Sequence, residues 1–365
     1  MKFIYLTSKN YPGNTADHGF VQKQAESLVK VLGLDFVLVA SGLVEGDLSR
    51  NIKSPFLKIR RGKILFYFFW SLFFYLSIKR KDKNILFFSN DAYLLSILIW
   101  WRKILGFKYK IVSDWHQLFK DWRDKYVALN SDYLITTTRV LKNRLVNDFK
   151  VDDKKVLVSY GGVNLDLFKA VPDDKNILRE ELNLPLNKKL IGYVGYFKTM
   201  GMDKGVGDII EALKFLDENF IAVLVGGKEI EQKEYKKMAQ DFGVLNRCIF
   251  VDRQEESNLI KYKKAMDILV IPYPNREHFR EWGFPMKTYE YMASGVPIIY
   301  SNLNILDEVL NGLAVAYEAE NVKDLADKIK GINIDSLKLS KKAQGVVKNY
   351  TWNERVSNII NFISK

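Results

Sequence analysis

Short runs of consecutive apolar residues alternate with longer, helix-patterned segments along this chain of 365 residues. Runs such as Phe36–Ala40 and Ile268–Ile271 are typical of strands that are buried on both faces of a sheet. Strands that are separated by helical segments form parallel sheets with helices on both faces. The alternation therefore predicts an α/β fold, and the length of the chain suggests two domains.

The predicted elements fall into two sets, which a polar stretch at residues 170–174 separates. The first set comprises strands at Phe3–Thr7, Phe36–Ala40, Ile85–Ser89 and Lys110–Ser113 and helices at Val21–Leu32, Ile64–Ile78 and Ala92–Leu105. The second set comprises strands at Leu190–Val194, Ile221–Val225, Ile249–Val251, Ile268–Ile271 and Pro297–Ser301 and helices at Val206–Leu216, Glu231–Phe242, Glu256–Lys264 and Lys287–Ala293. We therefore expect one domain of residues 1–170 together with a terminal helix at 350–365, and a second domain of residues 171–349. Two doubly wound domains would bind ligands at the carboxyl ends of their strands, in a cleft between them.

The net charge of +13 lies in the first part of the chain. Residues 1–150 contain 25 Lys and Arg against 12 Asp and Glu, whereas residues 151–365 contain 31 of each kind. This one-sided positive charge favours an anionic partner, namely a membrane surface, nucleic acid or a phosphorylated substrate, although a solvated basic surface would also explain it. The single cysteine, Cys248, excludes an intrachain disulfide and fits a reducing, cytoplasmic compartment.

One apolar run, Ile64–Ile78, extends over 15 residues without a charged side chain. As a helix it would be about 22 Å long, which is shorter than the roughly 30 Å hydrocarbon core of a bilayer. Apolar residues surround the whole helix, so we favour a core helix that is buried on more than one side. The alternative is peripheral contact of residues 60–103 with anionic lipid on the inner face of the cell membrane. Basic residues flank the run, and a second run, Ala92–Trp101, ends in two tryptophans.

A glycine loop, a short helix and a buried strand follow one another in residues 281–299. Pro285 starts the predicted helix, where its missing N–H costs nothing, and Gly295 ends it. The free N–H groups at such a helix start form an anion site. Glu290, about one and a half turns into the helix, is placed to hydrogen-bond hydroxyl groups near a bound phosphate. The alternative is that Glu290 pairs with Lys287 on a surface face.

This segment resembles the donor-binding motif of the retaining GT-B glycosyltransferases of family 4, the glycosyl transferases group 1. The family pattern is Glu, seven residues and a second Glu, followed by a small-Gly-x-Pro turn. Glu290 and the residues at 294–297 match the second half of the pattern. Trp282 stands where the first Glu belongs, and Glu281, one place earlier, is the candidate replacement.

Some branches of the family instead carry a Pro-x-Lys-x-x-Glu form, which Pro285, Lys287 and Glu290 match. The resemblance implies that Glu290 binds the ribose of a sugar nucleotide and that the helix start binds its phosphates. The donor-binding residues implied in this segment are Phe284, Pro285, Met286, Lys287 and Glu290.

The segment at residues 192–206 is similar to the family's strand–loop element, in which two basic residues hold the donor pyrophosphate. Lys204 matches the second basic position, whereas Tyr196 stands at the usual first one, so Lys198 is the candidate substitute. Two cations near a leaving diphosphate would stabilise the charge that builds up as the glycosidic bond breaks. The resemblance implies catalytic and donor-binding roles for Lys198 and Lys204, and the alternative is a loop of exposed lysines.

Two features of the first domain also resemble the family. The loop at residues 11–20 resembles the glycine loop that approaches the donor phosphate and the acceptor, and Gly19 would let the backbone come close to a ligand. His116 follows the strand predicted at Lys110–Ser113, where the family commonly has a histidine beside the transferred sugar. The resemblance implies a catalytic role for His116, and the alternative is a structural histidine next to Asp114.

These matches predict a GT-B enzyme, with two Rossmann-like domains that face each other across a cleft and a C-terminal helix that crosses back to the first domain. The implied activity is transfer of a sugar, with retention, from a UDP- or GDP-linked donor to a glycan or lipid-linked acceptor in cell-surface polysaccharide or glycoconjugate synthesis. No cofactor or metal is expected, because the sequence has no Asp-x-Asp motif and no Cys/His cluster.

Three alternatives remain. A sugar-nucleotide epimerase of the same fold would use similar phosphate contacts without an acceptor. A nucleic-acid-binding protein would explain the basic first part, but we expect no nucleic-acid partner because the basic residues are scattered and no recognition motif occurs. An inactive scaffold is suggested by Trp282 and Tyr196, which replace acidic and basic residues of the family pattern.

Overall fold

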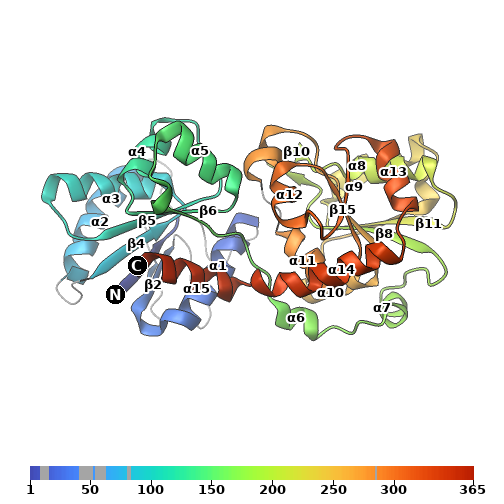
Figure 1. Cartoon of the computed structure of the whole chain (residues 1–365), viewed down its shortest axis with the longest axis horizontal. Coiled ribbons are helices and arrows are strands. Elements are labelled where there is room, and N and C mark those ends of the chain that lie inside the picture. Colours follow the sequence, from blue (N-terminus) through green and yellow to red (C-terminus); the bar gives the residue numbers. More distant parts are fainter. Residues whose placement is uncertain (9–15, 41–51, 54–62, 80–83, 284–285) are drawn as a thin grey trace. The chain divides into compact units, whose positions relative to one another are not determined.

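The computed structural model describes residues 1–8, 16–40, 52–53, 63–79, 84–283 and 286–365. The chain forms two compact units, and each is an α/β structure (Figure 1). Unit 1 consists of Met1–Gly161 and Trp352–Lys365, and unit 2 consists of Gly162–Thr351. The boundary between the two units thus lies after Gly161, whereas the polar stretch at residues 170–174 suggested a later domain boundary.

In the described part of unit 1, all strands belong to one parallel sheet. In spatial order they are β3 (Ile52–Lys53), β2 (Phe36–Ala40), β1 (Lys2–Leu6), β4 (Ile85–Ser89), β5 (Lys110–Trp115), β6 (Tyr133–Thr136) and β7 (Val156–Val158). β1, β2 and β4 are buried along their whole length, which is why each reads as an uninterrupted apolar run. The strand order reverses between β1 and β4, so the carboxyl ends of these two strands form the switch point of unit 1.

Helices cover this sheet, and the last helix of the chain is one of them. They are α1 (Ala16–Leu32), α2 (Lys63–Lys79), α3 (Ala92–Leu105), α4 (Trp122–Asn130), α5 (Arg139–Phe149) and α15 (Trp352–Ile363). α15 lies along α1 (Figure 1), and its residues Val356, Ile359 and Ile363 belong to the same apolar core as β1 and β2. The prediction that the C-terminal helix returns to the first domain is confirmed.

The apolar run of α2 is buried on one side only. Tyr67 and Tyr75 are almost fully buried, whereas Phe69, Phe73 and Leu76 are 50%, 67% and 41% exposed. The expectation of a core helix that is buried on more than one side is therefore wrong for this face. None of the helices in the described segments is long and apolar enough to cross a membrane.

Unit 2 has a parallel sheet and a small antiparallel pair. The parallel strands, in spatial order, are β12 (Cys248–Val251), β11 (Phe220–Val225), β8 (Lys189–Val194), β13 (Ile268–Ile271), β14 (Ile298–Ser301) and β15 (Val315–Tyr317), and the pair is β9 (Lys198–Thr199) with β10 (Met202–Asp203). The chain runs from β8 outward to β12 and then returns to β13 on the other side of β8. The switch point, where α/β sheets bind ligands, therefore lies at the carboxyl ends of β8 and β13.

The helices of unit 2 surround this sheet (Figure 1). They are α6 (Leu165–Lys169), α7 (Lys175–Glu181), α8 (Val206–Ala212), α9 (Glu229–Asp241), α10 (Glu256–Ala265), α11 (Lys287–Ser294), α12 (Asn304–Leu310), α13 (Val322–Lys330) and α14 (Ile334–Val346). The helix predicted at Val206–Leu216 is shorter as an α-helix because its last turn is a 3₁₀ turn. α11 and α8 begin next to the switch point and carry the predicted site residues toward it.

Candidate active site

The loop after β8 passes directly over the end of β13, and Gly205 makes this approach feasible. Gly205 has φ +79°, and a Cβ atom at this position would lie 1.7 Å from the carbonyl oxygen of Pro272. Only glycine tolerates both this backbone conformation and this contact. The close approach holds Lys204, the preceding residue, at the switch point, where it is 91% buried.

Lys287, the first residue of α11, places its amine at the same switch point. The side chain is 8% exposed, and its Nζ lies 3.5 Å from the ring centroid of Tyr193 in β8. A Cβ atom on Gly195, which follows β8, would be 3.3 Å from this Nζ. Among the residues that the structure describes, no group accepts a hydrogen bond from the Lys287 amine. A buried cationic donor without an acceptor is costly, so this amine marks a place for an anion.

The charges around Lys287 are unbalanced. Burial lowers the pKa of Lys287 well below its ordinary value, and the nearby Lys204 and Lys263 lower it further, while Glu290 opposes them. Burial also lowers the pKa of Lys204, to about 8, against the opposing effect of Glu231. Lys204 and Lys263 therefore both act on Lys287, while Glu290 opposes them and Glu231 acts on Lys204. These lysines outnumber the two carboxylates, so an anion would balance the charge of the site.

Glu290 is held by a lysine that the sequence patterns did not single out. Its Oε2 lies 2.8 Å from Nζ of Lys263 in α10, and the Lys263 side chain is only 4% exposed. The alternative of a surface pair with Lys287 is therefore wrong. Lys263 follows the buried Ile260 by three residues, so helical phase places it on the buried face. This position on the buried face of the helix was the sequence feature that could have identified Lys263 as a buried lysine.

The other predicted donor-site residues lie in different surroundings. Lys198, in β9, forms an ion pair with Glu234 of α9, whose hydrogen bond raises the pKa of Lys198. Glu281 lies in a π-helical turn at His278–Trp282, 3.7 Å from Arg280. Met286 directly precedes α11 and is half-buried. Phe284 and Pro285 lie outside the described residues. The structure thus brings Lys204, Lys287 and Glu290 together and gives Lys198 a separate partner.

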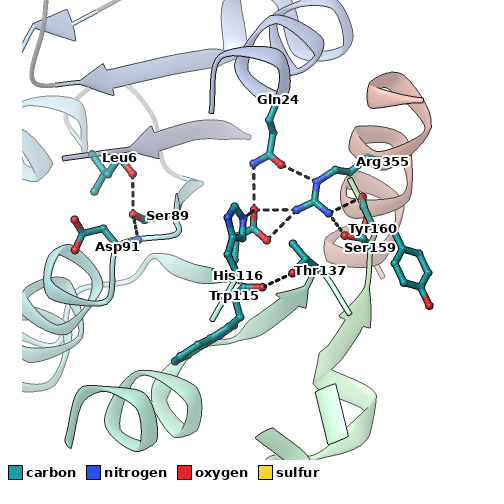
Figure 2. A network of polar contacts seen from close by, with 11 residues as sticks. Leu6, Gln24, Ser89, Asp91, Trp115, His116, Thr137, Ser159, Tyr160 and Arg355 are labelled. Carbon is teal, nitrogen blue, oxygen red and sulfur yellow. Dashed lines mark hydrogen bonds and ion pairs between the residues drawn. The ribbon is translucent and has the colours of Figure 1, made fainter. Parts of the chain in front are cut away.

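In unit 1, His116 directly follows β5 and rests against Asp114 (Figure 2). Its Nε2 lies 3.2 Å from Oδ2 of Asp114. Asp114 is fully buried and accepts both Nη2 contacts of Arg355 from α15, at 2.9 Å each. Burial alone would raise the pKa of Asp114, but Arg355 and then His116 outweigh it and hold the pKa well below its usual range. The carboxylate is therefore charged at neutral pH.

Gly19 lies beside this cluster, within the first turns of α1 rather than at its start. Its neighbour Phe20 packs edge-on against the His116 ring, with centroids 4.3 Å apart. A Cβ atom at Gly19 would meet no atom of the described residues within 4 Å. At the adjacent switch point, Ser89 donates to the carbonyl of Leu6 and accepts from the backbone N–H of Asp91 (Figure 2). Asp91 also receives a hydrogen bond from Ser8. The predicted residues Gly19 and His116 therefore share one end of the unit 1 sheet.

No group of three or more His, Cys, Asp or Glu side chains in the described part of the chain is arranged to hold a metal ion.

Comparison with known proteins assigns the architecture to a class. A glycosyltransferase from Rickettsia africae superposes with a TM-score of 0.78 at 18% identity, covering 99% of this chain and 97% of that one. HepE from Anabaena, solved in complex with UDP, gives a TM-score of 0.76 at 17% identity over the full length of both chains. The fold is therefore GT-B, that of a large class of glycosyltransferases, and the fold prediction is confirmed.

The sequence match lies mainly in unit 2. Residues 174–349 match the family described as glycosyl transferases group 1. A D-inositol 3-phosphate glycosyltransferase of Xylanimonas cellulosilytica is 28% identical over 204 residues, which are 53% of this chain and 46% of the relative. The chain thus spans about half the length of the curated relatives that it matches.

Replacing Lys287 by Met should raise the free energy of unfolding by about 1–3 kcal/mol, because it removes a buried amine without an acceptor and keeps the side-chain volume. The matched change Lys263→Met should lower it by about 2 kcal/mol, because it leaves the Glu290 carboxylate without its partner. Chemical denaturation of both variants at pH 7 measures the two changes. If Lys287→Met destabilised the chain as much as Lys263→Met, the amine would have a compensating partner.

Proposed function

We propose that this chain is a retaining glycosyltransferase that transfers a sugar from a nucleotide diphospho-sugar to a glycan or lipid-linked acceptor in cell-surface polysaccharide or glycoconjugate synthesis. The observation that carries the proposal is the buried amine of Lys287, which has no acceptor among the described residues and lies beside Lys204 at the switch point of unit 2. A diphosphate supplies the negative charge that this site lacks.

In the proposed donor complex, the diphosphate lies between Lys204 and Lys287, and Glu290 binds the ribose hydroxyls. Lys263 holds the Glu290 carboxylate in place for that contact. Lys287 thereby takes the role that the family pattern gives to a basic residue at position 196, since Lys198 is engaged with Glu234. The UDP complex of HepE supports a UDP-linked donor, and a GDP-linked sugar would fit the same diphosphate site.

The proposed chemistry is charge stabilisation and positioning. As the glycosidic bond breaks, the diphosphate leaves with the bonding electron pair, and the two lysines stabilise the charge that it gains. The departing diphosphate accepts the proton of the attacking hydroxyl on the same face of the sugar, so configuration is retained. His116 contacts the transferred sugar. No resident metal is part of this proposal, because the lysines provide the counter-charge.

A transfer assay tests the activity. The chain is incubated with labelled UDP-, GDP- and ADP-sugars and with membrane lipid extract or free glycans, in Mg²⁺ or in EDTA. We expect label in the lipid or glycan fraction with one donor type under both conditions. Isomerised donor without transfer would support the epimerase, and turnover of no sugar nucleotide would contradict an enzyme of either kind. Loss of transfer in EDTA that Mg²⁺ restores would contradict the metal-independent mechanism.

Donor-site variants should weaken UDP or GDP binding while the chain stays folded. Glu290→Gln, Lys204→Ala and Lys287→Met each remove a charged contact of about 1.5–3 kcal/mol, or about 10- to 100-fold in Kd. Lys198→Ala and the exposed control Lys233→Ala should leave Kd nearly unchanged. Calorimetric titration measures these constants. Unchanged affinity in the first three variants would contradict the site.

The lowered lysine pKa values also predict a pH dependence. Diphosphate favours the charged amines, so binding takes up protons where Lys204, with a pKa of about 8, is partly neutral in the free chain. The affinity for UDP should therefore fall as the pH rises from 7 to 9, and the heat of binding near pH 8 should depend on the ionisation enthalpy of the buffer. Lys204→Ala should reduce both effects. An affinity that is constant over this range would contradict the proposed contact.

We also propose that unit 1 docks peripherally on anionic lipid at the inner face of the cell membrane. The α2–α3 surface, defined as Phe69, Phe73 and Leu76 of α2 with Trp100, Ile104 and Leu105 of α3, supports it because all six apolar side chains are exposed. The two helices pack together through Phe68 and Trp101, whose ring centroids are 4.3 Å apart. Exposed Lys79 and Lys103 accompany the surface, and anionic lipid contributes about 1 kcal/mol per basic residue near it.

Vesicle sedimentation tests the docking. The chain should sediment with vesicles of anionic phosphatidylglycerol and less with neutral phosphatidylcholine, and binding should weaken at high salt. Phe69→Ser/Phe73→Ser should reduce sedimentation without unfolding the chain. The matched change Ile230→Ser/Ile334→Ser, at similarly exposed positions of unit 2, should have no effect. Equal recovery of the wild-type chain with both lipids at low salt would contradict the docking.

A further inference from the structure

We propose that Arg355 of the C-terminal helix is a positioning residue for His116, because it holds two groups that contact the His116 ring. Those groups are the Asp114 carboxylate and the Phe20 ring. The inference rests on the proposed function, in which His116 contacts the transferred sugar. Under this inference, α15 contributes to the active site. This helix belongs to unit 1, although it follows unit 2 along the chain.

Arg355 is fixed by its own contacts, and every contact lies within unit 1 (Figure 2). Its side chain is 1% exposed and contacts both oxygens of Asp114 at 2.9 Å. Its Nε donates to Oε1 of Gln24 at 2.8 Å, and its Nη1 donates to the carbonyls of Ser159 and Tyr160. A planar guanidinium that uses both terminal nitrogens and Nε in this way has one orientation.

Gln24 closes a ring of contacts between Arg355 and Asp114. Its Oε1 accepts from Arg355, and its Nε2 donates to Oδ2 of Asp114 at 3.3 Å. Oδ2 is also the oxygen that lies 3.2 Å from Nε2 of His116. The carboxylate oxygen that faces His116 is therefore fixed from two sides, by an amide and by a guanidinium. The fixed carboxylate therefore lies in contact with the His116 ring, although the 3.2 Å contact does not have the geometry of a hydrogen bond.

The second support of His116 also depends on α15. The Phe20 ring meets the His116 ring at a centroid distance of 4.3 Å and an interplanar angle of 62°. The Arg355 guanidinium carbon lies 5.0 Å from the Phe20 centroid, and the Trp352 ring packs edge-on against Phe20 at 4.9 Å. Phe20 is thus enclosed between α15 and His116. The contacts of His116 with Asp114 and with Phe20 therefore both lead back to α15.

The anchoring of α15 does not by itself require this ion pair. Val356, Ile359 and Ile363 already bury the helix in the core of unit 1. A buried ion pair adds little net stability compared with apolar residues of similar size, because both charges lose their hydration. A purely structural Arg355 could therefore be replaced, together with Asp114, at little cost. If Arg355 positions His116, the same double replacement should impair the reaction even though the chain stays stable. This difference distinguishes the positioning role from the structural one.

The test compares three variants of the full chain. Arg355→Met removes the guanidinium, Asp114→Leu/Arg355→Met removes both charges and so avoids an unpaired buried carboxylate, and Ile359→Ala loosens α15 without touching the network. Each is measured for thermal stability, for UDP affinity, for kcat and KM with the sugar nucleotide that gives transfer, and for the nuclear Overhauser contact between the His116 and Phe20 rings. The chain has three histidines, so a His116→Gln variant assigns the His116 signals.

We expect the double variant to be as stable as Ile359→Ala or more so, to bind UDP normally, and to lose kcat about 10- to 100-fold together with the His116–Phe20 contact. Ile359→Ala should keep both kcat and the contact. A stable double variant with wild-type kcat and an intact ring contact would overturn the positioning role. If the wild-type chain transfers no sugar, the proposed function fails, and the ring contact alone then decides whether Arg355 orients His116.

Discussion

The uncompensated amine of Lys287 is the constraint on which the candidate site depends. It lies buried at the point where the strand order of unit 2 reverses, against the Tyr193 ring and beside two further buried lysines. The fold tolerates this arrangement because Gly195 and Gly205 allow the backbone to come close where a side chain would collide. Protein interiors rarely keep polar hydrogens without acceptors. We therefore propose that a ligand completes the site and that this ligand is an anion.

The buried charges of unit 1 follow the opposite principle. Arg355, Asp114 and Gln24 form hydrogen bonds and an ion pair with one another, and Arg355 also donates to nearby carbonyls. All three nitrogens of the guanidinium therefore have acceptors. A balanced network is rigid and holds a neighbouring ring in place, whereas an unbalanced one attracts a ligand. The two units thus contribute different components to the proposed reaction. Unit 2 supplies electrostatic binding for the donor, and unit 1 supplies a fixed imidazole near its own switch point.

The sequence predicted those features of the fold that depend on local apolar pattern. The buried runs at Phe36–Ala40 and Ile268–Ile271 are β2 and β13 with the predicted bounds. β6 and β7 were missed because Tyr133–Thr136 and Val156–Val158 are short and flanked by polar residues. The prediction that α2 is buried on more than one side was also wrong. A helix that is apolar all round is fully buried only where other elements pack against every side of it.

Site residues were predictable where a motif fixed their spacing, as for Lys204 and Glu290. Lys263 and Arg355 were not, because their partners lie far away along the chain: Asp114 and Arg355 are 241 positions apart. Both do leave a local signal, since each falls in helical phase with buried neighbours, Lys263 with Ile260 and Arg355 with Ile359. A charged residue on the apolar face of a helix indicates a buried partner, although it does not identify that partner.

The departures from the family pattern can be understood in the same physical terms. Tyr196, at the usual basic position, lies under Arg253, whose guanidinium carbon is 4.4 Å from the ring centroid, and Tyr193 lies under Lys287. An aromatic ring thus occupies position 196, where the family pattern has a basic side chain. Arg253 and Lys287, from other elements, place positive groups against the rings of Tyr196 and Tyr193. An inactive scaffold has no reason to keep Lys287, because an apolar residue would relieve its burial cost. Lys287, which belongs to the Pro-x-Lys-x-x-Glu form of the family pattern, places an amine at the switch point of unit 2, and this argues for a donor site rather than an inactive scaffold.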